Sequence, residues 1–293
     1  THDLPLVVKA DGLAGGKGVF IAETRDEARD AVQKLMVQKA FGGAGRKIIL
    51  EEHLTGREAS FFAVTDGRQV IPLVTCQDYK RVHDGDRGPN TGGMGTYSPA
   101  LHLDRTLTAT VLERIVGPTI RGIAKEGHPY RGVLYVGLML GDQGPRVLEY
   151  NCRFGDPETQ VLLPRLGSDL VPLLAAAAHG DLSSVRVEWR REAAVCVVLA
   201  AQGYPGSYQK GKRISGLELF VGRTDILFFH AGTRTGPGGE IRTASGRVLG
   251  ITGLGRDISE AREKVYDAAS RVSFPGMHYR RDIAAEVEAS RAS

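Results

Sequence analysis

The 293-residue sequence has no long apolar run, few cysteines and no cluster of basic residues. A membrane-spanning helix needs about 20 consecutive apolar residues, and the absence of such a run argues against an integral membrane protein. The formal net charge is +4, and the Lys and Arg residues are scattered along the chain. This distribution does not favour nucleic-acid binding.

The sequence contains only three cysteines, Cys76, Cys152 and Cys196, and they form no C-x-x-C pair. We therefore expect no disulfide framework, and a reducing compartment, the cytoplasm, is the default location. The eight histidines show no zinc-type spacing. Cys152 follows Asn151, and it is better interpreted as a small residue packed behind a site than as a nucleophile.

The most distinctive stretch of the sequence is 147–158, VLEYNCRFGDPE, which is typical of a strand followed by a turn and a helix. Alternate residues of a strand share a face, so Glu149 and Asn151 would offer two oxygen ligands on one side, which suits Mg²⁺. Arg153 adds a guanidinium that fits a carboxylate or phosphate. Asp156-Pro157 predicts a helix start with Asp as the N-cap. The alternative interpretation is a strand with polar residues on its solvated face.

A glycine-rich loop lies near the amino terminus, between apolar stretches at 4–10 and 19–21 that predict strands. Glycines leave backbone N–H groups uncovered, and such a loop can cradle phosphate oxygens. Lys9 and Lys17 add positive charge. The spacing is neither that of a P-loop nor that of a dinucleotide fingerprint, and a flexible hairpin tip is an equal alternative. Because the first strand is expected almost at residue 1, we also expect an upstream part of the protein.

The segment 77–97 is long, polar and rich in glycine, and it predicts a functional loop. Elsewhere the spacing of apolar residues predicts helices and strands. The expected helices are 25–38 (capped by Thr24), 107–123 (kinked or split at Pro118), 157–166, 169–179 (capped by Ser168 and ended by Gly180) and 258–272 (capped by Asp257). The expected strands include 47–52, 132–140 and 193–201, and Asp66-Gly67 predicts a hairpin turn.

Four stretches together resemble the phosphoribosylamine–glycine ligase (glycinamide ribonucleotide synthetase) family of ATP-grasp enzymes. They are KADGLAGGKGV (9–19), EEHLTGREASFF (51–62), QDYKRVHDGDRGPNTGGMG (77–95) and EYNCRFGDPETQ (149–160). The resemblance implies an α+β, ATP-grasp fold, with two α+β subdomains enclosing the nucleotide and a smaller, mostly antiparallel carboxy-terminal domain. The expected divisions are a lid subdomain at 1–62, a main subdomain at 63–188 and a carboxy-terminal domain at 189–293.

By this resemblance, the protein would join glycine to 5-phosphoribosylamine at the expense of ATP. The products would be glycinamide ribonucleotide, ADP and phosphate, formed through glycyl phosphate in de novo purine biosynthesis. ATP would be a co-substrate and Mg²⁺ or Mn²⁺ the metal. The protein would be a monomer without nucleic-acid or membrane partners. The family's amino-terminal domain is not recognised in this sequence, so the chain is expected to be a fragment that works with that domain.

The resemblance also implies a role for individual residues. ATP would contact Lys9, Gly15, Gly16, Lys17, Gly18, Glu51, Glu52, Leu54 and Glu58. The metal would be held by Glu149 and Asn151. Arg153, Asp78 and Lys80 would act in catalysis, with Arg153 stabilising the acyl phosphate or the glycine carboxylate. Glycine and phosphoribosylamine would contact Asn90, Thr91, Gly92, Gly93 and Asp156.

Two other functions remain open from the sequence. One is an ATP-grasp ligase or carboxylase that acts on another acid, although the segment 89–95 argues against it. The other is a nucleotide-binding module without turnover. Magnesium-dependent nucleotide binding without ADP formation would distinguish this second case.

Overall fold

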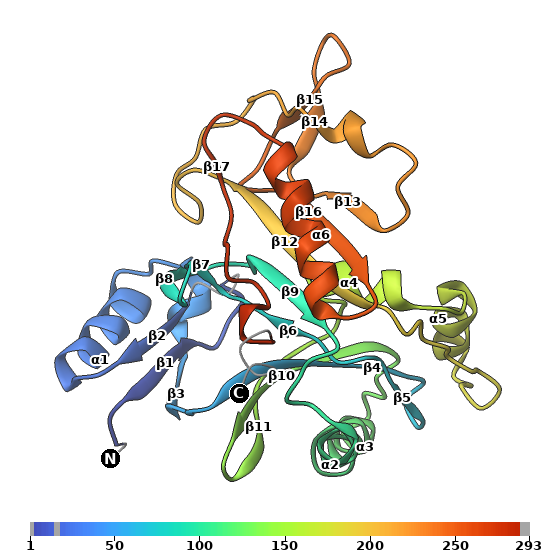
Figure 1. Cartoon of the computed structure of the whole chain (residues 1–293). Coiled ribbons are helices and arrows are strands. Elements are labelled where there is room, and N and C mark those ends of the chain that lie inside the picture. Colours follow the sequence, from blue (N-terminus) through green and yellow to red (C-terminus); the bar gives the residue numbers. More distant parts are fainter. Residues whose placement is uncertain (1–2, 15–17, 288–293) are drawn as a thin grey trace. The chain divides into compact units, whose positions relative to one another are not determined.

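The computed structural model describes residues 3–14 and 18–287 (Figure 1). The chain forms two compact units, Thr1–Gly56 and Arg57–Ser293, and each is described by itself. In the described part of the chain, no helix is both long and apolar enough to cross a membrane. The expected α+β composition is confirmed, because antiparallel sheets and helices occur in both units.

The first unit is a three-stranded antiparallel sheet covered by a helix. The strand order is β2–β1–β3, with β1 at Leu6–Ala10, β2 at Val19–Ala22 and β3 at Ile48–Glu52. Thr24 caps α1 (Arg25–Val32) by accepting a hydrogen bond from the Glu27 N–H, as predicted. The helix continues as a π-helical turn, η1 (Gln33–Val37), and a short 3₁₀ helix, η2 (Gly42–Arg46), precedes β3. Leu6, Val8, Ala31 and Leu35 form the core of this unit.

The second unit contains a four-stranded antiparallel sheet in the order β11–β10–β4–β5. Its strands are β4 (Arg57–Thr65), β5 (Val70–Pro72), β10 (Gly132–Gly141) and β11 (Gly144–Asn151). The predicted hairpin at Asp66-Gly67 joins β4 to β5, and Gly67 has φ +95° there. The division expected between residues 62 and 63 falls inside β4.

Helices cover both faces of this sheet. One face packs against α2 (Arg105–Val111), the π-helical turn η3 (Leu112–Val116) and α3 (Gly117–Lys125). The chain is helical throughout these residues, and the π-helical turn lies just ahead of Pro118. The other face packs against α4 (Thr159–Arg165) and α5 (Leu170–His179). Gly180 ends α5 as predicted, but the cap is Asp169, which accepts from the Val171 N–H. Ser168 instead accepts from the Glu188 N–H, so the predicted cap was wrong by one residue.

A second, larger sheet combines distant parts of the sequence. Its order is β13–β16–β12–β9–β6, and β17 pairs with the end of β12. The strands are β6 (Gln77–Asp78), β9 (Gly95–Ser98), β12 (Ala193–Ala201), β13 (Ile226–His230), β16 (Arg247–Gly255) and β17 (Met277–His278). Between β6 and β9 lies the hairpin formed by β7 (Arg81–His83) and β8 (Arg87–Asn90). The segment 77–97 is therefore not one long loop.

The sequence did not predict these strands because their side chains are mostly polar or absent, whereas strand pairing uses the backbone. The few large apolar residues of the segment, Tyr79, Val82, Met94 and Tyr97, are all buried. Tyr97 lies opposite Val195, so β9 belongs to the same sheet as the carboxy-terminal strands. Whether residues 63–188 and 189–293 behave as separate domains stays a prediction.

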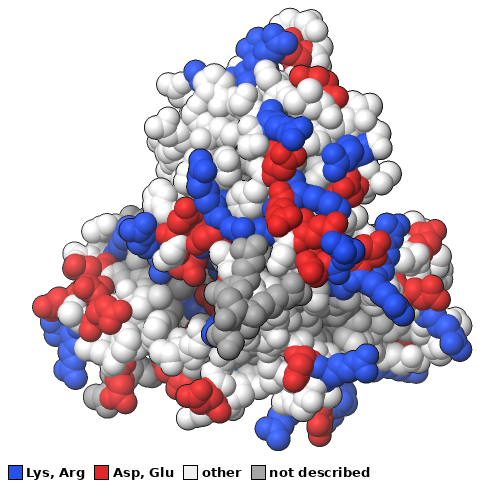
Figure 2. Space-filling view, viewed as in Figure 1, with Lys and Arg blue, Asp and Glu red and all other residues white. Residues whose placement is uncertain are grey.

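Strand β12 is the centre of the larger sheet, and all of its residues are buried. Val195, Val197 and Leu199 join the core beneath α6 (Ile258–Arg271), while Cys196 faces the core that contains α4. Asp257 caps α6 as predicted. On the face shown in Figure 2, charged groups of both signs alternate over the region of α6. They include the ion pairs Arg256–Glu260, Lys264–Glu260 and Arg271–Asp267.

The remaining elements are a short 3₁₀ helix, η4 (Leu217–Phe220), and a two-stranded ribbon of β14 (Thr233–Thr235) and β15 (Ile241–Thr243). Cys76, Cys152 and Cys196 are all free, as expected. Cys152 is exposed, so the prediction that it packs behind the site was wrong. The chain bends directly after β11, and this bend turns the Cys152 side chain to solvent.

Candidate active site

The end of β11 presents the predicted pair of oxygen ligands on one face. The Asn151 side-chain amide donates to Oε1 of Glu149 over 3.2 Å, and the Glu149 side chain is otherwise exposed. On the neighbouring strand β10, Tyr135 lies opposite Asn151 and Gly137 lies opposite Glu149. The predicted shared face is therefore confirmed, and the metal-binding role stays a prediction.

Gly137 provides the space that the Glu149 side chain occupies. A Cβ atom at residue 137 would lie 3.1 Å from Cγ of Glu149 and 3.4 Å from the Tyr135 hydroxyl. Such a contact is closer than ordinary van der Waals separation, so a larger residue would displace the carboxylate from its present position.

We therefore expect Gly137→Ala to weaken divalent-metal binding about tenfold, because changes in the groups that orient a metal ligand commonly lower metal affinity 10–100-fold. Mn²⁺ titration followed by electron paramagnetic resonance, with a non-hydrolysable ATP analogue present, measures this affinity directly. The matched control is Gly122→Ala in α3, where an added Cβ meets no atom within 4 Å. Equal Mn²⁺ affinities in the two variants would contradict the prediction.

Arg153 follows β11 in the bend, where its side chain is exposed and Nη1 donates to the Phe154 carbonyl over 2.8 Å. The predicted helix start at Asp156-Pro157 was wrong. Residues 156–158 form a turn with a cis Asp156–Pro157 peptide, and α4 begins at Thr159. The Asp156 carboxylate does not cap the helix, because it accepts from the Gln160 side chain at 3.1 Å and pairs with Arg247 at 3.3 Å.

Arg247, at the start of β16, joins two predicted substrate-binding segments. Its Nη1 donates to the carbonyls of Gly92 and Asp156, each over 2.7 Å. Gly93 has φ +112°, and a Cβ there would lie 2.3 Å from Cδ of Pro157. The structure thus brings Gly92, Gly93 and Asp156 together. Sequence reasoning missed Arg247, because no local pattern distinguishes it from other strand-terminal arginines.

A buried polar cluster lies between the two sheets, centred on Ser60 of β4. The Ser60 hydroxyl lies 3.1 Å from Oδ1 of Asp78, 3.3 Å from Oε1 of Glu158 and 3.3 Å from the Tyr135 hydroxyl. Asp78 and Glu158 are only 9% and 5% exposed. At the solvent side, Lys80 forms an ion pair of 2.9 Å with Glu58. The predicted residues Asp78, Lys80 and Glu58 therefore belong to one cluster.

Burial controls the ionisation of this cluster. Burial, followed by the charge of Asp78, raises the pKa of Glu158 to about 7. The pKa of Asp78 is also raised, chiefly by burial. Burial would lower the pKa of Lys80, but the charges of Asp78 and Glu58 outweigh it and hold that pKa well above its usual value. A carboxyl group that is close to half-protonated at neutral pH therefore lies beside a permanently charged lysine.

Sequence reasoning gave Glu158 no role, although a signal was present. Glu158, Val161, Leu162 and Arg165 follow the i, i+3, i+4, i+7 spacing of a buried helical face. All four are buried in the structure. Two charged residues on an apolar helical face are a pattern that marks buried polar interactions.

The raised pKa of Glu158 makes stability depend on pH. The folded protein binds this proton more tightly than the unfolded chain does. The resulting contribution to the free energy of unfolding is complete below about pH 4.5 and is lost as the pH rises through about 7. Glu158→Gln should therefore gain stability relative to the parent protein when the pH is raised from 5 to 8. Urea unfolding at both values measures this change. The exposed Glu113 provides the control, Glu113→Gln, and an equal pH response in both variants would contradict the prediction.

The first unit contains the remaining predicted ATP contacts. Lys9 on β1 forms an ion pair of 2.5 Å with Glu51 on β3, and Glu52 and Leu54 follow at the end of that strand. The Ala10 N–H donates to the Gly18 carbonyl over 2.9 Å. A Cβ at Gly18 would lie 2.7 Å from Cβ of Ala14. Gly15, Gly16 and Lys17 lie outside the described residues.

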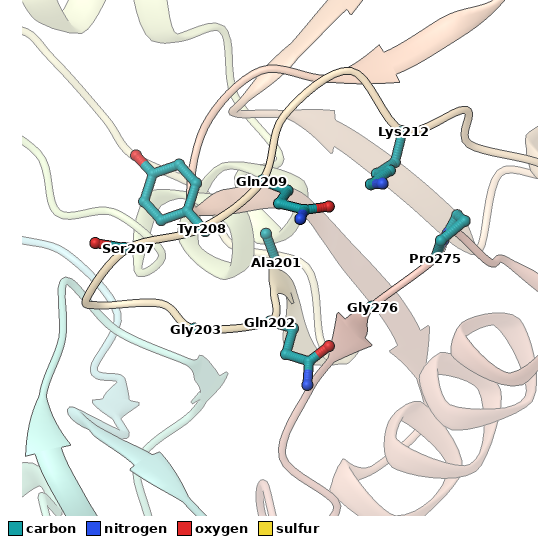
Figure 3. A pocket seen from close by; sticks show the side chains of 9 residues that line it. All are labelled: Ala201, Gln202, Gly203, Ser207, Tyr208, Gln209, Lys212, Pro275 and Gly276. Atoms are coloured by element: carbon teal, nitrogen blue, oxygen red, sulfur yellow. The ribbon is translucent and has the colours of Figure 1, made fainter.

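A cavity of about 620 Å³ lies elsewhere in the second unit, between the segments 201–212 and 275–276. Figure 3 shows Tyr208 and Ser207 on one side of it and Pro275 and Gly276 on the other. None of the predicted site residues that the structure describes lines this cavity. Among the residues that the structure describes, no group of three or more His, Cys, Asp or Glu side chains is arranged to hold a metal.

Comparison with known protein families identifies the chain. The family model for the phosphoribosylglycinamide synthetase ATP-grasp (A) domain matches residues 1–159, and the model for the C domain of the same family matches residues 194–286. The chain belongs to the phosphoribosylglycinamide synthetase family. The matched regions contain all of the residues that were predicted to bind ATP, metal and substrates.

Curated relatives of this synthetase family agree with the assignment. A phosphoribosylamine–glycine ligase of Vibrio cholerae is 51% identical over 280 residues, which is 95% of this chain and 65% of the relative. A ligase of Vigna unguiculata is 51% identical over 93% of this chain and 88% of the relative. The chloroplastic ligase of Arabidopsis thaliana is 49% identical, and this chain spans 53% of its length. The chain thus spans about half of the Arabidopsis relative and about two thirds of the Vibrio relative.

Solved structures confirm the ATP-grasp fold. The phosphoribosylamine–glycine ligase of Thermotoga maritima matches with a TM-score of 0.87 and 43% identity, over 96% of this chain and 69% of that protein. The biotin carboxylase domain of Hydrogenobacter thermophilus 2-oxoglutarate carboxylase matches with a TM-score of 0.65 at 17% identity, over 94% of this chain and 58% of that one. The second likeness concerns the fold alone.

Proposed function

We propose that this synthetase-family chain is part of a phosphoribosylamine–glycine ligase, which joins glycine to 5-phosphoribosylamine at the expense of ATP. The observation that carries the proposal is the arrangement at the end of β11. Glu149 and Asn151 share a face there, and the exposed guanidinium of Arg153 follows them in the bend. This arrangement suits a reaction in which phosphate charge must be neutralised close to a carboxylate.

The proposed reaction has two steps. A carboxylate oxygen of glycine attacks the γ-phosphorus of ATP, the bond to the bridging oxygen breaks, and ADP leaves. The amine of phosphoribosylamine then attacks the acyl carbon of glycyl phosphate, phosphate leaves, and the nitrogen loses a proton. Both steps depend mainly on positioning and charge stabilisation, so no side chain has to act as a nucleophile.

The residues divide between these tasks. The donors of Glu149 and Asn151 are a carboxylate and an amide oxygen, which fit Mg²⁺ or Mn²⁺. When bound, such an ion supplies charge neutralisation at the phosphates. Arg153 would hold the reacting carboxylate or acyl phosphate through its fork of donors. In the first unit, Lys9 and the glycine loop would hold ATP phosphates, while Glu51, Glu52 and Leu54 would contact adenine.

The second unit would bind the other substrates. Asp78 and Lys80 lie in the buried cluster, and their charges would orient glycine. The turn that contains Asn90, Thr91, Gly92 and Gly93 lies beside Asp156 and would contact phosphoribosylamine, while Glu58 would reach the ribose of ATP. We further propose a monomeric cytoplasmic protein. The Arabidopsis relative is named as chloroplastic.

The test is ADP release with Mg-ATP, glycine and freshly generated phosphoribosylamine. It is measured on this chain and on a chimaera in which the part of the Vibrio ligase that precedes the match is fused ahead of it. We expect the chimaera to release ADP only when glycine is present, and alanine in place of glycine serves as the control. ADP release that does not depend on glycine would indicate another acid substrate. Mg²⁺-dependent nucleotide binding without ADP release would indicate a binding module.

A further inference from the structure

The carboxy-terminal segment, residues 277–286, contacts the β7–β8 hairpin at several points. The His278 Nε2 atom lies 2.8 Å from the Val82 carbonyl oxygen. Asp84 accepts from the Arg281 N–H, and Asp282 accepts from the Gly85 N–H, each over 2.8 Å. Figure 1 shows the chain after β17 descending beside β7 and β9. The hairpin is therefore held by a part of the sequence about 200 residues away from it, far beyond the reach of local turn interactions.

Arg280 forms the centre of this contact. Its side chain is 1% exposed, and its Nε and Nη2 atoms each donate to one carboxylate oxygen of Asp282 over 2.7 Å. Its Nη1 atom donates to Asp86 over 2.6 Å and to the Arg81 carbonyl over 3.2 Å. A buried charge needs such partners, and a forked guanidinium provides them in a fixed geometry. Arg280 thus holds both strand β7 and the turn that joins it to β8.

Arg280 also packs against Tyr79. Its guanidinium carbon lies 4.8 Å from the centre of the Tyr79 ring. The Tyr79 hydroxyl donates to Glu286 over 2.5 Å and accepts from the Ala284 N–H over 2.8 Å. Tyr79 lies between Asp78 and Lys80 in the chain. The side chains of these two neighbours belong to the buried cluster, where Asp78 contacts Ser60 and Lys80 pairs with Glu58. Fixing Tyr79 towards the carboxy-terminal segment therefore fixes its two neighbours towards the buried cluster.

The residue that follows the hairpin, Thr91, is hydrogen-bonded to Lys80, which precedes the hairpin. The Thr91 N–H and hydroxyl both donate to the Lys80 carbonyl, over 2.7 Å and 2.8 Å. Thr91 leads directly into the Gly92-Gly93 turn, which lies beside Asp156 through Arg247. A shift of the hairpin would therefore move the buried cluster and this turn together.

We infer that Arg280 is a positioning residue for the amino-acid substrate, acting through Tyr79 and the β7–β8 hairpin without touching the substrate itself. This inference rests on the proposed function. It gives the carboxy-terminal segment a task in substrate binding, because the residues that this segment orients all lie on the glycine and phosphoribosylamine side of the proposed site.

The test uses the chimaera and the variants Arg280→Met and Arg280→Lys, with separate Michaelis constants for glycine and ATP. We expect Arg280→Met to raise the constant for glycine about tenfold, since small displacements of positioning groups have large kinetic effects. The constant for ATP should change less than about threefold, because most predicted ATP contacts lie in the first unit. Arg280→Lys should be intermediate. The control is Arg271→Met, at an exposed ion pair on α6.

A second variant separates positioning from folding. The Asp86 side chain is 68% exposed, so Asp86→Asn should fold while losing one charged partner of Arg280. We expect this variant to raise the glycine constant about threefold without a matching loss of thermal stability. If all folded variants keep the parent constant for glycine and only their melting temperatures fall, Arg280 is merely structural and the inference is wrong. Absence of glycine-dependent ADP release from the parent chimaera would instead overturn the proposed function, and the inference with it.

Discussion

Glu149→Gln is expected to lower glycine-dependent ADP release by the chimaera about a thousandfold, which is comparable to the loss of one preorganised charge-stabilising group. The substitution keeps the length and shape of the side chain but removes its charge. Glu149 and Asn151 share one face of β11, with Nδ2 of Asn151 3.2 Å from Oε1 of Glu149. After the substitution, neither of the two side chains would carry a carboxylate. Phosphate charge would then be poorly neutralised when the γ-phosphoryl group is transferred.

Initial rates at saturating ATP and glycine, measured over a range of Mg²⁺ concentrations, check this expectation. If the defect is in metal binding, high Mg²⁺ should restore part of the rate. Glu113→Gln, on the exposed side of η3, removes a surface carboxylate of the same size and should stay within about threefold of the parent. A Glu149→Gln protein that turns over as fast as this control would exclude the carboxylate as a metal ligand.

The second large effect is expected at Arg153, where Arg153→Lys should lower the turnover number about a hundredfold. Lysine keeps the positive charge but loses the planar fork that binds two oxygens at once. In the structure the Arg153 guanidinium is exposed, and the Phe154 carbonyl is its hydrogen-bond partner. Most of its donors are therefore available for a ligand, and the arginine side chain makes little contribution to packing.

The turnover number and the Michaelis constant for glycine separate the two roles proposed for Arg153. A fall in turnover number alone indicates stabilisation of the transition state, whereas a rise in the glycine constant alone indicates binding of the carboxylate. Arg114→Lys, at an exposed position of η3, is the matched control. Neither quantity should change in that control, and unchanged kinetics in Arg153→Lys would remove Arg153 from the site.

Local geometry explains which parts of the site were predictable. The shared face of Glu149 and Asn151 follows from the two-residue repeat of a strand, which requires no knowledge of the rest of the fold. The caps at Thr24 and Asp257 are equally local, because a side chain there bonds to a backbone N–H three residues later. The cap expected at Asp156 failed because Arg247 and Gln160 bind that carboxylate, and Arg247 lies about 90 residues away, outside any local window.

The elements that escaped prediction depend on long-range partners. Three of the four residues of strand β9 are small or polar, and the strand forms because its backbone pairs with β12 on one side and β6 on the other. The role of Arg280 likewise depends on Asp86, in a hairpin that was expected to be an irregular loop. Glu158 differs from these elements, because a local signal for its burial was present. Its helical spacing with Val161, Leu162 and Arg165 predicts a shared buried face.

The pairing of β9 with β12 has a consequence for how the protein is made on the ribosome. Tyr97, which is completely buried, lies opposite Val195, and translation of the roughly 100 residues between them takes about 5–20 s at ordinary rates. During that interval β9 can pair with β6 but not with β12, so the backbone groups on its β12 edge and the Tyr97 ring are exposed to other chains. Nascent chains stalled within this interval should therefore bind chaperones, and release should coincide with the emergence of β12 from the exit tunnel.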